Sequence, residues 1–175
     1  MSKKILIYGL AFGSACAALE YLFYTNGIYK DMGLTRFLVM LSEYILIPVF
    51  GIFVFIKSYR DSNPEQFVLG KVVFMGFFVS IIIGSSISLL FSYLVQFKPF
   101  YINDAIAFYE NQFKASKAGL KRTPEEMKTA LENIKYNFSA SQQFIFHLFL
   151  GGSRGLFFSA IFGYFLRPKN TTPAN

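Results

Sequence analysis

Four ionisable residues lie inside apolar stretches of the chain, where a charged side chain is costly: Glu20, Glu43, His147 and Arg154. In hydrocarbon, such residues pair with one another or mark the path of an ion, a proton or a ligand. Glu43 and Arg154 fall in half-spans that face the same side of the membrane, on the order of 10 Å and 15–20 Å below its surface. The sequence therefore predicts one intramembrane polar cluster of these four residues. Its expected ion pair is Arg154–Glu43, with Glu20 as the second acidic partner.

Two interpretations of this cluster remain open. In the first, the ion pair only locks helices together, because isolated charges in hydrocarbon form pairs whether or not anything binds. In the second, the cluster is a site for an ion, a proton or an anionic ligand. His147 is expected to be an interfacial residue, since a single histidine without further ligands makes a poor metal site. The sequence favours the lock.

The remaining candidates for chemistry have simpler explanations. Glu125 and Glu126 are adjacent carboxylates, but they occupy the first turn of an expected helix and complement its dipole. The stretch 151–155 is glycine-rich, yet it lies within an apolar span and is not a phosphate loop. Cys16 is interpreted as a packing residue; a lipoprotein signal ending there is opposed by the apolar run that continues to Phe23. Because no hydrolase, kinase or zinc-site signature occurs, we expect no catalytic residue, metal or cofactor, and no enzyme.

The composition indicates the environment that must hold these residues. The chain has 175 residues, of which 54% are hydrophobic and 15% charged, whereas a soluble domain carries about 25% charged residues. The net charge is +7, and the basic residues stand mainly beside apolar segments. That placement indicates anchoring to anionic headgroups, so membrane lipid is an expected partner and nucleic acid is not.

Four apolar segments are long enough to cross a bilayer: about 5–25, 36–56, 67–97 and 141–166. The third is longer than lipid requires, so we expect it to tilt or protrude. Pro48 is expected to kink the second, with a neighbouring helix covering the carbonyl that it frees. The predicted fold is all-α: residues 1–175 form a single membrane domain, an integral membrane four-helix bundle.

Small residues recur at every fourth position in three of the four spans. Such stripes let two helix backbones approach closely, often with right-handed crossings. We therefore expect tight helix–helix contacts along the following residues: Gly9, Gly13 and Ala17; Gly76, Ser80, Gly84, Ser88 and Ser92; and Gly151, Gly155, Ser159 and Gly163.

Residues 98–139 differ from the spans because charge rises and the apolar residues fall on one helical face. A first amphipathic helix is expected over 102–116, with Gly119 as its stop. Thr123 and Glu126 form a capping box around Pro124, which predicts the start of a second helix. The sequence thus predicts an amphipathic helical hairpin, inserted between spans three and four. It either lies on the membrane surface or caps the bundle.

The topology follows from the number of spans and the basic residues. Four spans place both termini on one side. Of the 17 lysines and arginines, Arg154 lies within a span, seven lie on the terminus side and nine on the hairpin side. The seven crowd the span ends, and the positive-inside rule weights charges close to spans. We therefore expect both termini in the cytoplasm and the hairpin outside.

Several short motifs resemble those of a family of small bacterial membrane proteins, a domain-of-unknown-function family with four spans, found mostly in Bacteroidetes-type bacteria. The resemblance covers about residues 3–169 and includes the glycine-rich last span. It implies the bundle architecture and the bacterial inner membrane, and it implies no mechanism. The motifs are Ile56-Lys57-Ser58-Tyr59-Arg60-Asp61, Phe67-x-x-Gly70-Lys71, Leu90-Phe91-Ser92-Tyr93 and Thr123-Pro124-Glu125-Glu126.

Two functions are compatible with these features. The first is a non-enzymatic structural or accessory subunit, acting through helix packing and the hairpin on a second copy or on a partner membrane protein. The alternative is a small oligomeric carrier or channel whose path passes Glu20, Glu43 and Arg154. Four helices enclose little space, so the alternative requires an oligomer. The direction of the small-residue stripes discriminates: stripes used within one bundle disfavour transport by an oligomer, and an outward stripe favours association.

Overall fold

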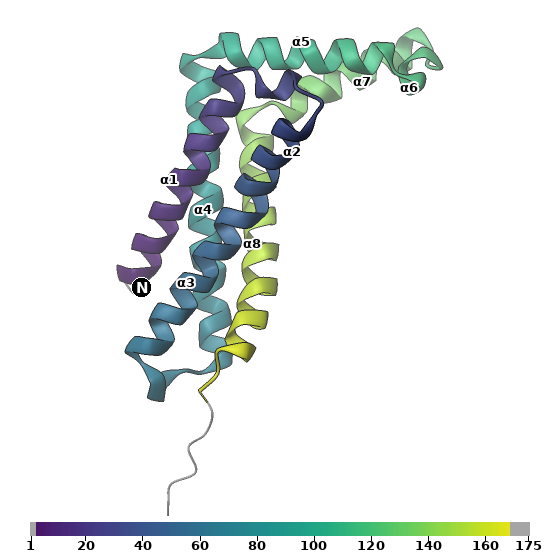
Figure 1. The fold of residues 1–175 in the computed structure, drawn as a ribbon. Coiled ribbons are helices and arrows are strands. Elements are labelled where there is room, and N and C mark those ends of the chain that lie inside the picture. Colours follow the sequence, from purple (N-terminus) through teal and green to yellow (C-terminus); the bar gives the residue numbers. More distant parts are fainter. Residues whose placement is uncertain (1–2, 169–175) are drawn as a thin grey trace, which may run out of the picture.

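Four helical rods form the body of the protein (Figure 1). The computed structural model describes residues 3–168, and all regular structure in that part is helical. The rods are α1 (Lys3–Thr25), a continuous stretch from Leu34 to Ser62, α4 (Leu69–Phe97) and α8 (Ala140–Phe165). Each is long and apolar enough to cross a membrane, so the predicted helical membrane bundle is confirmed.

The second rod is a single helix with an irregular middle. It consists of α2 (Leu34–Leu41), the π-helical turn η2 (Ser42–Leu46) and α3 (Ile47–Ser62). It runs six residues beyond the predicted end at Ile56, so the polar residues 57–61, which the predicted span left out, continue the helix. Nothing in them stops a helix; the break comes at Asn63, whose backbone is not helical (φ −145°, ψ 58°), before Pro64, where η3 (Pro64–Gln66) begins.

The small-residue stripes face neighbouring helices of the same bundle. A Cβ atom placed on Gly84 of α4 would lie 2.5 Å from the His147 carbonyl oxygen of α8, and one on Gly9 of α1 would lie 2.7 Å from Ile82 of α4. Only glycine permits these approaches. The close contacts predicted from the stripes are confirmed, and around them the core of the bundle includes Ile52, Phe55, Ile56, Val72, Val79 and Ile83, each without exposed surface.

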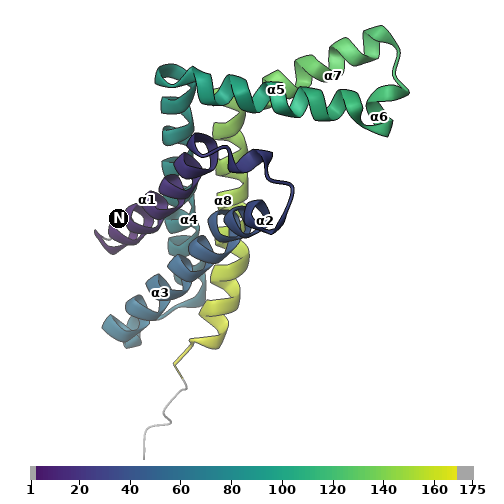
Figure 2. The same ribbon diagram turned by 45° about the horizontal axis from the view of Figure 1, so that its top comes forward.

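The hairpin crosses one end of the bundle and projects to its side (Figures 1 and 2). It consists of α5 (Pro99–Ala115), the short α6 (Lys117–Leu120) and α7 (Pro124–Asn137). The capping box at the start of α7 is confirmed, with Thr123 and Glu126 bonding each other's backbone N–H. Gly119 is not the stop of the first helix, which ends at Ala115. It lies within α6, where a Cβ would collide with the Phe113 carbonyl oxygen.

The base of the hairpin is built into the bundle by a second apolar cluster. Ile102 and Ala105 of α5 are buried there against a mainly aromatic set from the other elements: Phe23, Tyr24, Tyr29, Phe91 and Leu94. This burial fixes where the hairpin leaves the bundle, although its far end is supported only by itself.

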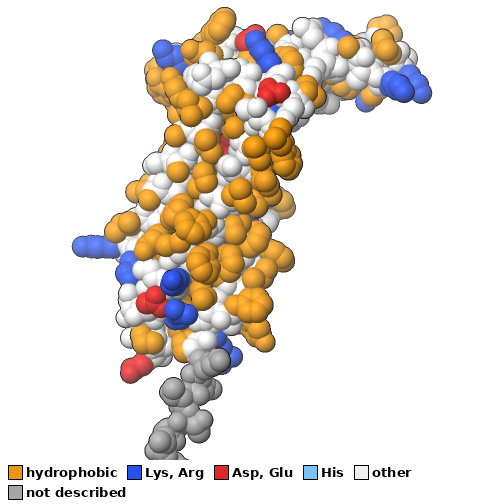
Figure 3. Space-filling model, viewed as in Figure 1, with side chains coloured by type: hydrophobic (Ala, Val, Ile, Leu, Met, Phe, Trp, Pro, Cys, Tyr) orange, Lys and Arg blue, Asp and Glu red, His pale blue; other side chains and the backbone are white. Residues whose placement is uncertain are grey.

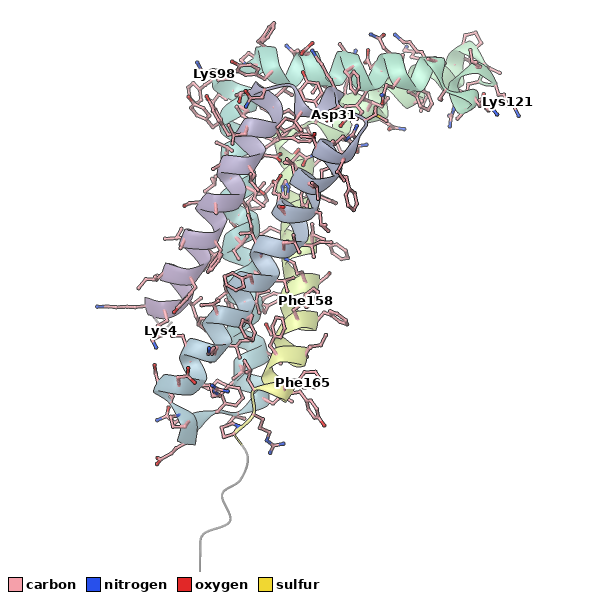
Figure 4. The ribbon with its side chains drawn as sticks, in the orientation of Figure 1. Lys4, Asp31, Lys98, Lys121, Phe158 and Phe165 are labelled. Atoms are coloured by element: carbon pink, nitrogen blue, oxygen red, sulfur yellow. The ribbon has the colours of Figure 1, made fainter. Side chains whose placement is uncertain are left out.

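The surface separates into an apolar body and charged ends. Hydrophobic side chains spread over the visible flank of the rods, with lysine, arginine and acidic side chains at the ends (Figure 3). Lys4 and Phe165 lie at one end, while Asp31 and Lys98 lie at the other and Lys121 marks the tip of the hairpin (Figure 4). The described start and end of the chain thus lie on the same side of the bundle. Lys169, counted toward the charge of that side, lies outside the described residues.

Candidate functional site

The four intramembrane residues predicted as a polar cluster are all buried. Their exposed fractions are 2% for Glu20, 1% for Glu43, 1% for His147 and 7% for Arg154. They come from α1, η2 and α8, which meet beneath the hairpin. The structure divides them into an arginine held by neutral groups and a pair of carboxyl groups beside a pocket.

Arg154 reaches across from α8 to α4 and η2. Its Nε donates to Ser80 Oγ at 3.2 Å, and its Nη1 donates to the Tyr44 carbonyl oxygen at 2.5 Å. Pro48 stands four residues after Tyr44 and has no N–H to offer that carbonyl. The guanidinium therefore supplies a donor that the proline removed, as expected for a neighbouring helix that covers the freed carbonyl.

The predicted direct ion pair between Arg154 and Glu43 is not formed. It is absent from the ion pairs of residues 3–168, all of which lie at the ends of the bundle or in the hairpin. The physical reason is competition: a carbonyl freed by proline lies within reach of the same guanidinium, and two neutral acceptors engage its Nε and Nη1. Glu43 is instead left to face Glu20.

The π-helical turn η2 sets the position of Glu43. Its wider winding is visible where the Ile47 N–H donates to the Ser42 carbonyl, five residues back. Single π-turns of this kind are frequent at functional sites. The Cys16 thiol of α1 lies 3.4 Å from the Glu43 carbonyl oxygen and donates to it. Backbone and side chain of Glu43 are thus both held against α1.

The carboxyl groups of Glu20 and Glu43 lie within hydrogen-bonding reach of each other. Oε1 of Glu43 is buried, and it has no hydrogen-bond partner among the described residues. Two carboxylates in contact away from water do not both carry a charge unless something positive joins them. The pair therefore either shares a proton or holds a cation.

A pocket of about 160 Å³ opens beside the two carboxyl groups. It is bounded by α1, the α2–η2 segment and α8, and the hairpin contributes one wall through Tyr109. Most of its lining is aromatic, and the full lining is Glu20, Phe23, Tyr24, Met40, Glu43, Tyr44, Tyr109, Gln143 and Phe146. A binding site at this place joins the bundle to the base of the hairpin.

Polar contacts beside the pocket hold the hairpin on the α1–α2 connection. Asp104 of α5 forms an ion pair with Lys30 at 2.6 Å and accepts a hydrogen bond from the Tyr29 hydroxyl. Lys30 and Tyr29 together lower the pKa of Asp104, whereas burial and the hydrogen bond to Asp104 raise the pKa of Tyr29. The Arg36 guanidinium lies over the Tyr109 ring, 5.3 Å from its centroid.

His147 lies outside the pocket lining. It was expected at the interface, but its ring is buried in the bundle and stacks on Tyr44 with a centroid distance of 5.9 Å. The Gln143 carbonyl, one turn earlier, approaches the ring without the geometry of a hydrogen bond. Within residues 3–168, no three His, Cys, Asp or Glu side chains gather as metal ligands.

Sequence reasoning missed most of the pocket wall. Tyr24, Tyr44 and Tyr109 were not candidates, because aromatic residues are abundant in the chain and their spacing shows no site. One signal is present in the sequence. Tyr44 stands next to Glu43 and four residues before Pro48, so its carbonyl lacks the usual helical N–H and needs another donor.

The comparisons with known proteins identify a family of unknown function. A family model described as a protein of unknown function (DUF4199) matches residues 7–168, nearly the whole chain. Neither the curated proteins nor the solved structures gave a match.

Proposed function

Because the chain belongs to this family, whose description states no activity, we propose its function from its own geometry. The protein is a non-enzymatic, multi-pass protein of the bacterial inner membrane that serves as a structural or accessory subunit for a partner membrane protein. The observation that carries this proposal is the hairpin, which is fixed at its base and projects beyond the bundle (Figure 2).

The surface offered to the partner runs along the hairpin from its tip toward its base. Leu120 at the tip is 75% exposed and Tyr136 on α7 is 57% exposed. A groove of about 460 Å³ runs between α5 and α7, and its lining is mainly apolar: Tyr109, Gln112, Phe113, Ser116, Ile134, Asn137 and Phe138. Exposed apolar groups rimmed by polar ones are typical of interaction surfaces.

The packing of the bundle favours a structural role over a transport path through it. Its small-residue stripes pack against neighbouring helices of the same chain, which disfavours the alternative of an oligomeric carrier or channel. A path along a single bundle would also have to pass core residues such as Ile52, Phe55 and Ile83, which have no exposed surface. The accessory role needs neither an opening nor an oligomer.

The proposed topology places both termini in the cytoplasm and the hairpin on the other side. It is tested by single cysteines in a Cys16→Ser background, one replacing Lys121 at the hairpin tip and one replacing Arg60 at the opposite end. In intact cells, a membrane-impermeant thiol reagent should label the first and not the second. The reverse pattern would invert the topology.

The accessory role is tested by a photo-crosslinking amino acid in the intact chain. Placed at Leu120 or Tyr136, it should give one defined adduct with a second membrane protein in native membranes. The matched control is Phe149, which is 76% exposed on α8 and should react with lipid. Adducts with lipid alone at all three positions, together with a monomeric mass in mild detergent, would overturn the proposal. An adduct with a second copy of this chain would replace the partner by a homo-oligomer.

A further inference from the structure

The pocket beneath the hairpin joins two acidic groups to an aromatic wall. Of its nine lining residues, two are acidic and five are aromatic, while Met40 and Gln143 complete the set. None of the nine is a lysine or an arginine. The local charge of the lining is therefore negative whenever either carboxyl group is ionised.

The cations closest to the pocket are engaged elsewhere. Arg154 donates to Ser80 and to the Tyr44 carbonyl. Arg36 donates to the Tyr29 carbonyl at 3.2 Å and lies over the Tyr109 ring. Neither carboxyl group of the pair forms an ion pair with a lysine or arginine of residues 3–168, although Arg154 lies close enough for its charge to act on Glu43.

A second observation concerns the hydrogen bonding of Glu43, one of these two carboxyl groups. Glu43, one of the residues that line the pocket, is 99% buried, and its Oε1 has no hydrogen-bond partner within residues 3–168. A buried carboxyl oxygen without a partner is costly. A ligand that donates to it removes this cost.

We propose that this pocket binds the ammonium group of a small primary amine, with the carboxyl groups of Glu20 and Glu43 accepting its N–H donors and aromatic side chains enclosing it. A primary ammonium carries three donors and one positive charge. It satisfies the free Glu43 oxygen and permits the second carboxyl group to remain ionised. This site goes beyond the accessory role and stands whether or not the hairpin binds a partner.

The composition of the lining favours an organic ammonium over a metal ion. Calcium takes six to eight oxygen ligands and magnesium prefers octahedral oxygen ligands, but the side chains of this pocket offer two carboxyl groups, one amide and three phenol hydroxyls, and five of the nine are aromatic. Aromatic faces attract ammonium groups, and cages of them with acidic neighbours are a recurring means of recognising organic cations. The volume of about 160 Å³ equals roughly five water molecules at about 30 Å³ each, which suits an amine of a few heavy atoms.

The place of the pocket allows two sources for the ammonium group. Two residues of its wall, Met40 and Phe146, are 38% and 47% exposed on the flank of the bundle, so a lipid headgroup can enter from the side. A soluble amine can enter from the aqueous phase beneath the hairpin. The chemistry is the same in both cases, and the experiment separates them.

The test uses the full chain, purified in detergent and in nanodiscs. In detergent, ethylammonium chloride should raise the midpoint of thermal unfolding in a saturable manner, while sodium and potassium chloride at equal ionic strength should not. In nanodiscs, phosphatidylethanolamine should raise that midpoint relative to phosphatidylglycerol. A shift with ethylammonium identifies a soluble amine as a ligand; a shift with the lipid alone identifies the headgroup. Either result supports the ammonium site.

The variants are Glu43→Gln and Glu20→Gln, which keep the shape of the side chain, with Glu132→Gln on the hairpin as the matched control. Removal of one charge-assisted hydrogen bond should weaken binding about tenfold or more, and the control should bind as the native chain does. Equal shifts with potassium and ethylammonium would overturn the ammonium assignment. Absence of any shift, or a shift that persists unchanged in both variants, would overturn the site itself.

Discussion

Arg154 and the Glu20–Glu43 pair are neighbouring buried charges that are satisfied in opposite ways. The arginine donates to Ser80 and to the Tyr44 carbonyl, both neutral and both fixed by helices. The two glutamates face each other, and one oxygen of Glu43 has no hydrogen-bond partner among the described residues. The arginine therefore has partners within the protein, whereas the pair of acids has an acceptor left over.

The difference separates a structural role from a binding role within one predicted cluster. An arginine that replaces a backbone donor lost to proline is part of the helix packing, so its removal should act on stability. A pair of acids beside a pocket is not needed for packing, since uncharged groups of the same shape would fit as well. Substitutions at the two places should therefore move stability in different directions.

The largest effect is expected at the arginine. Arg154→Ala leaves the Tyr44 carbonyl and the Ser80 hydroxyl without their donor and opens a void, which should lower the free energy of unfolding by about 2–4 kcal/mol. Denaturant unfolding in mixed micelles measures this loss. A double-mutant cycle with Pro48→Ala sharpens it, because that change restores an N–H four residues after Tyr44. The double variant should be about 1 kcal/mol more stable than the sum of the two single losses predicts. Strictly additive losses would show that the guanidinium does not replace the N–H that Pro48 lacks.

The next effect is expected where α4 and α8 touch beside Arg154. Gly84→Ala would bring a Cβ to 2.5 Å from the His147 carbonyl oxygen, so the two backbones must separate, at a cost of about 1–3 kcal/mol. Gly70→Ala is the matched control on the same helix, because no atom lies within 4 Å of its added Cβ. The midpoint of thermal unfolding should be clearly lower for Gly84→Ala than for Gly70→Ala. Equal midpoints would show that the close contact is not needed.

At Glu43, by contrast, we expect a substitution to leave the free energy of unfolding nearly unchanged or to raise it. Glu43→Gln removes the need to hold a shared proton or a cation between two acids, so stability without ligand should stay within about 1 kcal/mol of the native value or rise. The same unfolding assay as for Arg154→Ala provides the comparison. A loss as large as that of Arg154→Ala would mean that Glu43 belongs to the packing lock after all.

The smallest effect is expected at the hairpin base. Lys30 and Tyr29 lower the pKa of Asp104 below its ordinary value of 3.8, so their interaction stabilises the fold above that value and is lost as the pH falls through the depressed pKa. Because both charged side chains are partly exposed, Asp104→Asn should cost under about 1 kcal/mol. Hydrogen exchange near residues 28–30 and 101–108 should become faster in this variant at neutral pH. Unchanged exchange would show that the apolar cluster alone holds the hairpin.

Local pattern was sufficient for most of the fold. The lengths of the apolar runs predicted four spanning helices, the spacing of glycine and serine predicted their close contacts, and Thr123 with Glu126 predicted the start of α7. Each of these depends on residues near one another in sequence. The predicted end of the second rod is too early, because the residues after Ile56 are polar and yet contain nothing that breaks a helix.

The site could be predicted only in part. Sequence alone determined which residues are ionisable, that they lie within apolar helices, and that Pro48 must free a carbonyl. Only the tertiary structure decided the partners, since a guanidinium chooses among acceptors by distance, and the Tyr44 carbonyl and Ser80 lay within its reach. The pocket likewise forms only where five elements meet, with residues from Glu20 to Phe146. The periodicity of one helix holds no information about the residues that the other four place against it.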